Sequence, residues 1–583
     1  MAKRWRLLPH DMGRVEHLMR QSRLPAVVAQ VLIRRGVFHS EDVQRFLESR
    51  LTMLRDPEDL PGVPAAADQI HQAILDRKSI VIYGDYDADG ITGTAILFNG
   101  LKLLGADVSY FVPNRLEDGY GLNCDSIRKL ATRGKQMVIS VDCGIASPVE
   151  ADLCKELGLE LIVTDHHQFG DRLPDATLVH PRLPGTQYPF AGLCGAGVAF
   201  KLAWSVCQRA CGAKKVTERL RSYLMQSLAV AAIGTVADVV PMLDENRILV
   251  HHGLRSLLSN PSIGMRELLK ITKLDQKSAL SSEDIAFMLA PRLNATGRLG
   301  QAQLGVELLT TDNPVRAAAL AEYIDGLNGS RQTLERSVYL AADKQAKSEF
   351  DPDQDPALVL SGVDWHKGVI GVVAGRIAEK YGRPTIILSL DGAAGKPAIG
   401  SARSGGMVDL HAMLGECDEH LITYGGHAAA AGVTLDESSL DRFREAFCEA
   451  VSQNVPSDYE AEISIDAEAS FSLWNLETVK QVEMLEPFGD SNPRPIFCAS
   501  GVSLKEPARK MGGGDRHLTV NLVQQNSAMR AVAFGAGQWC EELNELNAPI
   551  DVAYRPVINE FRGYRKVEIQ IVDWRPSGQR ASD

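Results

Sequence analysis

Apolar and polar positions follow two different rhythms between about residues 65 and 185. Short runs of mostly apolar residues are each followed by a longer segment in which apolar residues recur every three or four positions. The short runs predict strands at 79–83, 108–112, 137–141 and 161–164. The longer segments predict helices at 65–77, 90–104, 124–133 and 147–157. Strands that alternate with helices form a mostly parallel sheet covered on both faces. We therefore expect an α/β domain here.

Other parts of the chain show different patterns. Residues 245–345 indicate further helices with an interruption at 291–298, and the pattern at 314–349 fits one long helix that would bridge two lobes. After about residue 456, short β runs separated by turn residues suggest a small barrel or sandwich. The predicted parts are an N-terminal helical segment at 1–60, an α/β domain at 61–255, a helical region with the connecting helix at 256–350, a second α/β domain at 351–455 and a β-barrel domain at 456–583.

Acidic and imidazole side chains follow several of the predicted strands. Asp85, Asp87 and Asp89 come directly after the first strand, and alternate positions of an extended chain direct them to the same side. Asp142 follows the strand at 137–141, and Asp165-His166-His167 follows the strand at 161–164. Ligands of such sheets bind beyond the carboxyl ends of the strands. We therefore expect these side chains to converge at one edge of the sheet.

Such a group offers ligands for two divalent cations. Hard cations prefer oxygen ligands, and a mixed set of carboxylates and imidazole suits Mn²⁺, with Mg²⁺ as the second candidate. Two ions about 3.5–4 Å apart would activate water and stabilise the oxygens of a phosphoester during hydrolysis, and Asp142 is the natural candidate to bridge them. Asp238, just after an apolar helix predicted at 224–233, adds a carboxylate. The predicted metal ligands are Asp85, Asp87, Asp89, Asp142, His166 and Asp238.

Each of these motifs also has a structural interpretation without any ligand. An isolated Asp-x-Asp sequence is more often a solvated turn than a metal site, and an isolated His-His pair is more often packed or exposed. Here the residues of ligand type recur at the ends of several strands of one predicted sheet. This recurrence favours the metal site over both alternatives.

The composition limits the class of protein. The 583 residues carry a formal net charge of −12, so we expect no global attraction to a polyanion, although a local basic groove or a metal-centred phosphate site is compatible with it. The ten cysteines include no CxxC pair, which fits a reducing compartment. The sequence has no signal peptide and no apolar run of the roughly 20 residues that span a bilayer. We expect a cytoplasmic protein without a membrane partner.

Two further stretches suggest contact with a nucleic acid. Gly425-Gly426-His427 opens a run of small residues ending at Gly432, where the backbone could approach a phosphate closely and a helix could begin. A tight packing turn is the alternative there, and Arg298 could equally cap a helix or pair with an acid. Near the C-terminus cations are interleaved with aromatic residues, which suits a single-strand groove or, alternatively, an ordinary strand surface. These residues are Arg555, Phe561, Arg562, Tyr564, Arg565 and Lys566.

Taken together, the motifs resemble those of the DHH phosphoesterases, and their order resembles that of the bacterial members that degrade single-stranded DNA. The resemblance runs from about residue 60 to the end of the chain. It rests on Gly84-Asp-Tyr-Asp-Ala-Asp-Gly90, Pro113-Asn-Arg115, Asp118-Gly-Tyr-Gly-Leu122, Val141-Asp142, Asp165-His166-His167, Gly234-Thr-Val-Ala-Asp238, Ala290-Pro-Arg-Leu-Asn-Ala295, Gly297-Arg298, Trp365-His366, Gly425-Gly426-His427 and Ile558-Asn-Glu-Phe-Arg-Gly563.

The resemblance implies a fold and an activity. It implies a DHH catalytic domain, a DHH-associated domain after the long helix, and an oligonucleotide-binding (OB-like) barrel at the C-terminus. The implied enzyme is an exonuclease that hydrolyses single-stranded DNA in the 5′-to-3′ direction with Mn²⁺ or Mg²⁺, in DNA repair and recombination. The implied partners are single-stranded DNA, a RecQ-type helicase and a single-strand-binding protein.

The resemblance also implies roles for individual residues. Asp87 would serve one metal, Asp89, His166 and Asp238 the other, with Asp142 bridging, whereas Asp85 and His167 belong to the set without an assigned position. Implied catalytic residues are Asp142, His167, Arg298 and His427, and implied substrate contacts are Arg115, Arg298, Ser401, Arg403, Gly426 and His427. Cys143 and Ala402 depart from the family pattern, which often has Asn and Gly there. The side chain of Ala402 is expected to narrow the approach of a phosphate to the backbone.

Two other functions remain open at this point. A DHH phosphodiesterase of short oligonucleotides or cyclic-dinucleotide products would not need the C-terminal barrel or a chain of this length. A non-catalytic scaffold that binds single strands would not need the complete set of candidate ligands. Both are therefore less favoured than the exonuclease.

Overall fold

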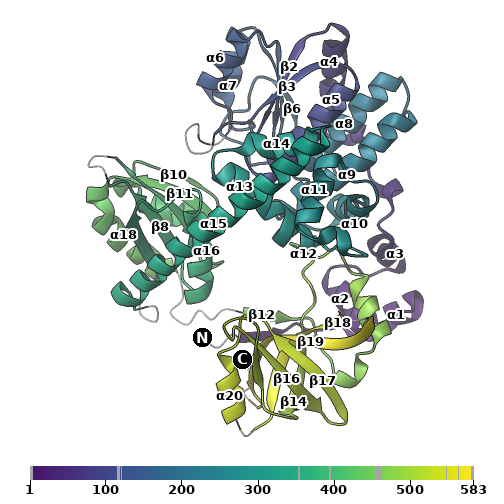
Figure 1. Ribbon diagram of the computed structural model, residues 1–583, viewed down its shortest axis with the longest axis vertical. Helices are drawn as coiled ribbons and strands as arrows, with labels where there is room; N and C mark the ends of the chain where they lie inside the picture. Colours follow the sequence, from purple (N-terminus) through teal and green to yellow (C-terminus); the bar gives the residue numbers. More distant parts are fainter. Residues whose placement is uncertain are drawn as a thin grey trace. The chain divides into compact units, whose positions relative to one another are not determined.

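The computed structural model describes residues 4–114, 119, 121–351, 355–392, 396–454, 462–546, 548–561 and 563–578 (Figure 1). The chain divides into two compact units. One unit combines Leu54–Val240 with Ile248–Tyr459 and holds both α/β domains, and the other combines Met1–Met53, Pro241–Arg247 and Glu460–Asp583. The second unit thus joins the two ends of the chain, which the sequence pattern had assigned to separate domains.

The first α/β domain is built on a five-stranded parallel sheet, as predicted. Its strand order is β3-β2-β4-β5-β6. One face is covered by α6 and α7 through a shared hydrophobic cluster. Helix α5 packs against β2, β3 and β4, and α8 packs against β4 and β5. The elements are α4 (Val63–Leu75), β2 (Ser79–Gly84), α5 (Ala88–Leu103), β3 (Asp107–Phe111), α6 (Cys124–Thr132), β4 (Met137–Val141), α7 (Pro148–Glu156), β5 (Glu160–Thr164), β6 (Thr177–Val179) and α8 (Gly195–Cys211).

A helical layer follows this domain. Its main helices are α9 (Glu218–Ala237), α10 (Asp244–Ser259), α11 (Ile263–Ile271), α13 (Ala290–Arg298), α14 (Ala302–Thr310) and α15 (Pro314–Glu349). The predicted interruption at 291–298 is wrong, because these residues form most of α13. Pro291 lies in the first turn of α13, and the π-helix Ile285–Leu289 runs directly into this turn, so the chain stays helical although proline has no N–H to donate. The long connecting helix is confirmed with the bounds that the pattern predicted.

The second α/β domain contains a mixed sheet of order β10-β11-β9-β8-β7. Gly425 and Gly426 lie on β10, which forms a hairpin with β11, so the helix that we expected to begin there is absent. The side chain of Ala402 is fully buried in the core behind β9 and therefore does not narrow the opposite face. The elements are β7 (Leu358–Val363), α16 (Ile370–Tyr381), β8 (Thr385–Leu390), β9 (Ala398–Arg403), α17 (Leu410–Gly415), β10 (Thr423–Gly426), β11 (Ala430–Leu435) and α18 (Leu440–Asn454).

The C-terminal strands close into a barrel. Strand β14 pairs with both β16 and β18, β18 pairs with β19, and β19 runs parallel to β17, which returns to β16. This circuit of five strands is that of an OB-fold, so the predicted barrel is confirmed. Its strands are β14 (Phe497–Leu504), β16 (His517–Gln524), β17 (Ser527–Ala533), β18 (Ile550–Phe561) and β19 (Tyr564–Pro576).

The N-terminal helices belong to the same core as the barrel. Leu18 on α1 (Met12–Ser22), Val28 on α2 (Ala26–Arg34) and Val43 on α3 (Ser40–Glu48) join a buried cluster with residues of the barrel strands. Strand β1 (Arg4–Leu7) pairs in parallel with β12 (Glu462–Ile465), and Trp5 Nε1 donates to Asp573 Oδ2 at 2.8 Å. Residues from the two ends of the chain thus complete one hydrophobic core.

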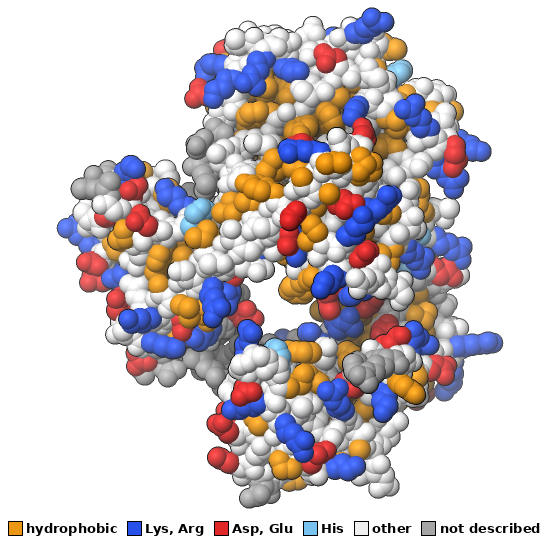
Figure 2. All heavy atoms as spheres, viewed as in Figure 1, with side chains coloured by type: hydrophobic (Ala, Val, Ile, Leu, Met, Phe, Trp, Pro, Cys, Tyr) orange, Lys and Arg blue, Asp and Glu red, His pale blue; other side chains and the backbone are white. Residues whose placement is uncertain are grey.

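No helix in the part of the chain that the structure describes combines the length and the apolar character needed to cross a bilayer. On the face shown in Figure 2, basic and acidic side chains are interspersed.

Candidate metal centre and phosphate pocket

The first carboxylates of the candidate site lie where β2 meets α5. Asp85 follows the strand directly, and its N–H donates to Val141 O at 3.2 Å. Asp87 caps α5, because its Oδ1 accepts from the N–H groups of Asp89 at 2.8 Å and of Gly90 at 3.1 Å. Asp89 is in the first helical turn, so the expected extended alternation is wrong. The three carboxylates come from a strand end, a helix cap and a helical turn.

Two further acids follow the neighbouring strands. Asp142 lies just after β4 with a left-handed φ of +64°, and its N–H donates to Thr164 O at 2.9 Å. Asp165 lies just after β5 and is fully buried. The parallel sheet therefore brings Asp85, Asp142 and Asp165 to the carboxyl ends of three adjacent strands, as the sequence pattern predicted.

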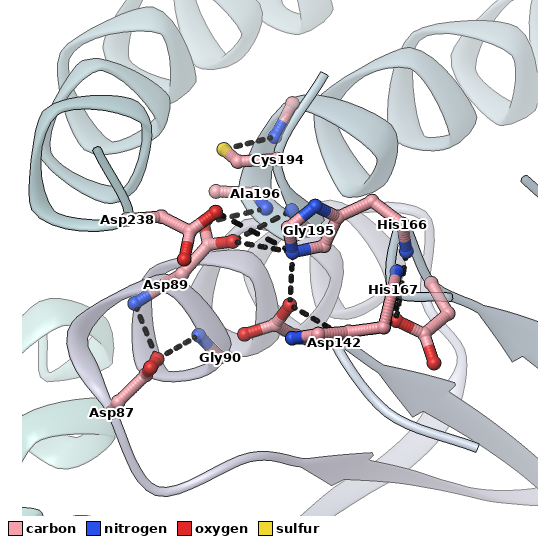
Figure 3. Close-up of polar contacts among 12 residues, drawn as sticks. Asp87, Asp89, Gly90, Asp142, His166, His167, Cys194, Gly195, Ala196 and Asp238 are labelled. Atoms are coloured by element: carbon pink, nitrogen blue, oxygen red, sulfur yellow. Dashed lines mark hydrogen bonds and ion pairs between the residues drawn. The ribbon is translucent and has the colours of Figure 1, made fainter. Parts of the chain in front are cut away.

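His166 points into the group of carboxylates (Figure 3). Its Nε2 lies 3.1 Å from Asp142 Oδ1, 3.5 Å from Asp238 Oδ2 and 3.8 Å from Asp89 Oδ2. Burial lowers the pKa of His166 to about 4, although the nearby Asp89 acts in the opposite direction. The imidazole is therefore neutral at physiological pH and can offer a lone pair to a metal.

The N-terminus of α8 holds Asp89 in place. Its two carboxylate oxygens accept from Gly195 N–H at 2.6 Å and from Ala196 N–H at 2.9 Å (Figure 3). The helix begins at Gly195, so these N–H groups lack intrahelical partners and favour a negative charge. Two glycines beside these carboxylates leave no room for a side chain. A Cβ on Gly195 would lie 2.5 Å from Asp142 Oδ1, and a Cβ on Gly234 would lie 2.5 Å from Asp89 Oδ1.

Asp238 reaches the group from α9, where it is the C-terminal cap. Its N–H donates to Gly234 O at 2.9 Å. Val239 follows with a φ of +57°, a conformation that is strained for a β-branched residue. Strain of this kind persists only where surrounding contacts enforce it. The turn thus holds the carboxylate at the end of the helix.

His167 is oriented by Asp165. Its Nδ1 lies 2.7 Å from Asp165 Oδ1 and 3.9 Å from Asp142 Oδ1. Burial acts to lower the pKa of His167, but the hydrogen bond and charge of Asp165 outweigh it and raise that pKa to about 9. The same contacts, with N–H donation from Ile145 at 2.9 Å, overcome burial and lower the pKa of Asp165 to about 2. The pair is therefore a half-buried imidazolium and a buried carboxylate at neutral pH.

The remaining acids repel one another. Burial, followed by the charges of neighbouring aspartates, raises the pKa of Asp142 and of Asp238. Burial raises that of Asp89 as well, although His166 partly opposes the shift. A neutral His166 does not offset this negative charge, whereas divalent cations would. The donor atoms also group suitably, with three ligand atoms within 4.8 Å of one another in each of two sets: Asp85, Asp87 and Asp142, and Asp89, His166 and Asp238. The residues thus fit two cations.

Helix α13 fixes the start of α5. Asn294 Oδ1 accepts from Ala88 N–H at 2.9 Å. Gly297 lies so close to the loop that a Cβ there would be 2.0 Å from Tyr86 O. These contacts explain two members of the Ala290–Ala295 and Gly297-Arg298 motifs for which the sequence offered no separate role.

A second cavity lies in the other α/β domain and at α13. It has a volume of about 410 Å³. Ser401 and Arg403 project from the same face of β9 because side chains alternate along a strand, and Arg403 Nη1 donates to Ser401 Oγ at 2.9 Å. Arg298 also lines it, and its Nη1 donates to Gly368 O at 3.0 Å. The sequence placed a helix N-terminus in the wrong segment, because it is α16 that begins at this cavity.

Not every predicted site residue joins these two groups. His427 is exposed in the turn between β10 and β11 and is not among the residues that line the cavity, whereas Gly426 is. Arg115 and Arg562 lie outside the described residues. Arg298 lines this second cavity and is not part of the groups of candidate metal ligands.

The sequence did not reveal the residues that support the two sites without belonging to the candidate ligands or phosphate contacts. Gly195 and Gly234 admit the carboxylates, Asn294 and Gly297 hold the loop, and Gly371 leaves space beside Arg403, since a Cβ there would lie 2.8 Å from Nη2. The only signal in the sequence was the presence of small residues within motifs. It did not show which carboxylate each glycine faces.

Known proteins agree with this architecture. Three protein-family models match: the DHH family, N-terminal domain, at residues 79–234; the DHHA1 domain at 354–453; and the RecJ OB domain at 465–573. The single-stranded-DNA-specific exonuclease RecJ of Bacillus subtilis (strain 168) is 36% identical over 98% of this chain and 70% of its own length. The protein of the same name from Salmonella typhimurium (strain LT2) is 34% identical over 95% of this chain and 96% of its own length.

Solved structures give the same result. The crystal structure of RecJ from Thermus thermophilus in complex with Mn²⁺ has a TM-score of 0.82 and 32% identity, covering 98% of this chain and 79% of that one. The structure of the Thermus protein with Mg²⁺ has a TM-score of 0.75 and 30% identity, covering 98% and 78%. The chain therefore belongs to the RecJ family of single-stranded-DNA-specific exonucleases.

Proposed function

We propose that the chain is an exonuclease that hydrolyses phosphodiester bonds of single-stranded DNA with two divalent cations, Mn²⁺ or Mg²⁺. The observation that carries the proposal is the pair of ligand sets around Asp142, Asp85 with Asp87 on one side and Asp89 with His166 and Asp238 on the other. The Mn²⁺ and Mg²⁺ in the crystal structures of the Thermus relative support the choice of metals.

In this proposal Asp142 would contribute its carboxylate to both cations. Asp85 and Asp87 would hold one of them, and Asp89, His166 and Asp238 would hold the other. Bound cations of this kind would activate water for attack and stabilise negative charge on the phosphoryl oxygens. The contacts of Asp89 with Gly195 and Ala196 keep the carboxylate fixed before any metal arrives, which lowers the cost of ordering it.

His167 has a different role. The ring is held by Asp165, and its pKa of about 9 keeps it cationic at neutral pH. A half-buried positive charge beside Asp142 suits stabilisation of the extra negative charge that develops on a phosphodiester under attack. We therefore assign His167 to the catalytic group rather than to the metal ligands.

The cavity at Ser401 and Arg403 suits the terminal phosphate of the strand. Arg298 and Arg403 supply positive charge, Ser401 a hydroxyl group, and Gly426 an approach without a side chain. A pocket that recognises a terminal phosphate restricts cleavage to strand ends, which is the property of an exonuclease. The proposed 5′-to-3′ direction rests on the family resemblance, as do the proposed roles of Arg115 and His427 in binding the substrate.

The OB-fold is proposed to bind part of the single strand. Tyr564 and Phe534 are 75% and 62% exposed, which suits stacking on bases. Arg565 pairs with Glu560, and Arg530 pairs with Glu568, so these two cations already have partners. We propose stacking rather than a strongly basic track as the main contribution of the barrel. A RecQ-type helicase and a single-strand-binding protein are proposed partners in cytoplasmic DNA repair and recombination.

Digestion of end-labelled DNA tests the proposal. With Mn²⁺ or Mg²⁺ the protein should release mononucleotides from a single strand, leave a blunt duplex intact, and be inactive with a chelator. A label at the 5′ end should be released first. Asp142→Ala should abolish release while single-strand binding persists, and near-normal release by this variant would refute the bridging role.

One alternative is a phosphodiesterase of short oligonucleotides or cyclic-dinucleotide products. The C-terminal barrel disfavours it, because a dinucleotide needs no extended binding surface. Comparing hydrolysis of a dinucleotide with that of a long strand separates the two. A preference for the dinucleotide would replace the exonuclease proposal, and no metal-dependent release from either substrate would favour the non-catalytic scaffold.

A further inference from the structure

A third cavity lies in the first α/β domain and its helical layer, away from both sites described above. It has a volume of about 860 Å³, within the range of about 300–1,000 Å³ that is usual for small-molecule sites. Its walls are the C-terminal half of α5, the N-terminal half of α9, the start of α11 and the end of α14, all labelled in Figure 1.

The cavity is separate from the candidate metal centre. Asn99 and Asp89 lie ten positions apart on α5, or about 15 Å at 1.5 Å per residue, and Gln226 lies about 18 Å from Asp238 along α9. The cavity and the metal centre therefore occupy opposite ends of the same two helices.

The walls are closely packed, so the cavity is formed before a ligand binds. A Cβ on Gly100 would lie 2.5 Å from the hydroxyl of Tyr223, which itself donates to Ile96 O at 2.7 Å. A Cβ on Gly264 would lie 1.7 Å from Leu308 O. These approaches join α5 to α9 and α11 to α14, respectively.

The rim of the cavity carries more basic than acidic side chains. Asp312 pairs with Lys102 at 3.0 Å, and Glu218 pairs with Arg221 at 3.8 Å. Arg219 and Arg266 are exposed and make no ion pair with any residue that the structure describes. Both carboxylates of the lining thus have a cationic neighbour, while two guanidinium groups are available to an anion. Arginine binds phosphate through two parallel hydrogen bonds.

Carboxamides supply a second kind of recognition. Asn99 Nδ2 donates to Leu309 O at 3.3 Å, and Gln226 Nε2 donates to Asn260 Oδ1 at 3.3 Å. These hydrogen bonds are longer than the usual 2.7–3.2 Å or so, and each amide also carries further donor or acceptor capacity. Side chains that both donate and accept suit the edge of a nucleobase.

We propose that this cavity is a second ligand site that binds a nucleoside monophosphate, with the phosphate at Arg219 and Arg266 and the base at Asn99, Gln226 and Asn260. The identification of this ligand as a product of the enzyme rests on the proposed function, whereas binding itself does not. Because the binding test needs neither metal nor catalysis, its failure would leave the exonuclease proposal unaffected.

Calorimetric titration of the full-length protein tests the site. The measurement uses chelated, metal-free protein with Arg403→Ala, so that neither the metal centre nor the pocket at Ser401 contributes. Deoxyadenosine monophosphate should bind saturably with one site per chain. Deoxyadenosine and inorganic phosphate should each bind at least tenfold more weakly, because each lacks one half of the recognised ligand.

Matched variants locate the binding. Arg219→Glu with Arg266→Glu should weaken the affinity at least tenfold, whereas Arg255→Glu, an exposed arginine of α10 outside the cavity, should not change it. Ser222→Trp, which places a large side chain at the rim, should also block binding and serves if the double variant does not fold. The proposal is overturned by absence of saturable binding, by undiminished binding in folded variants, or by equally tight binding of deoxyadenosine.

Discussion

The substitution Gly195→Ala isolates the role of close packing at the candidate metal centre. Gly195 is the first residue of α8, and its N–H donates to Asp89, an interaction that alanine retains. The added Cβ would lie 2.5 Å from Asp142 Oδ1 and 2.6 Å from its Cβ. One methyl group thus perturbs one proposed bridging carboxylate while leaving every proposed ligand chemically intact.

The structure sets the size of the effect. Ordinary contact begins at 3.4 Å, so the Asp142 side chain has to move by about 0.9 Å. A misplacement of about 1 Å in a catalytic constellation costs roughly 10²-fold in rate. Stability should change little, because alanine is favoured over glycine in a helix by up to about 1 kcal/mol, which offsets part of the local strain.

The assay is single-turnover release of mononucleotide from 5′-labelled single-stranded DNA with Mn²⁺, together with thermal melting. Gly197→Ala is the matched control, since it lies on the same helix and its Cβ would be 3.3 Å from Leu193 Cδ2, the end of a side chain that can yield. We expect a loss of about 10²-fold for Gly195→Ala and near-normal rates for Gly197→Ala. Gly195→Ala activity within threefold of the wild type, with a well-folded protein, would refute the reasoning.

Four further outcomes follow from the same geometry. Gly234→Ala should weaken Mn²⁺ binding in calorimetry and slow cleavage about 10²-fold, since its Cβ would lie 2.5 Å from Asp89 Oδ1; unchanged affinity would contradict the contact. The melting temperature of the metal-free protein should fall as pH rises from about 4 towards 9. The reason is that the pKa values of Asp89, Asp142 and Asp238 are raised in the folded state, which therefore favours their protonated forms. For the same reason Mn²⁺ should raise the melting temperature more at pH 8.5 than at pH 5.5. Asp165→Asn should return the pKa of His167 towards 6.5 and make kcat/KM about 25-fold lower at pH 8 than at pH 6, so a flat pH–rate profile would exclude a catalytic imidazolium. Leu18→Ala should destabilise the unit that contains the barrel by about 2–5 kcal/mol in denaturant titration, and no destabilisation would separate the N-terminal helices from its core.

Much of the fold followed from local patterns. The parallel sheet, the helix Pro314–Glu349 and the barrel strands each have a periodicity that is visible within about ten residues. The convergence of Asp85, Asp142 and Asp165 followed from a rule of topology, that adjacent parallel strands end at the same edge. One error arose where backbone conformation depends on a distant partner: Gly425 and Gly426 form a hairpin with β11, and β11 pairs in turn with β9, where Gly432 faces Ser401.

By itself the sequence determined which candidate ligands follow the strands and on which edge of the sheet they gather, because strand periodicity and strand ends are local properties. Only the tertiary structure decided that Asp89 is held by Gly195, 106 positions away, that His167 is charged through Asp165, and that helices from the first 50 residues complete the core of the C-terminal barrel. The physical reason is that hydrogen bonds, burial and close approach depend on which surfaces meet in space. The pattern of residues along the chain does not show which surfaces pack against each other.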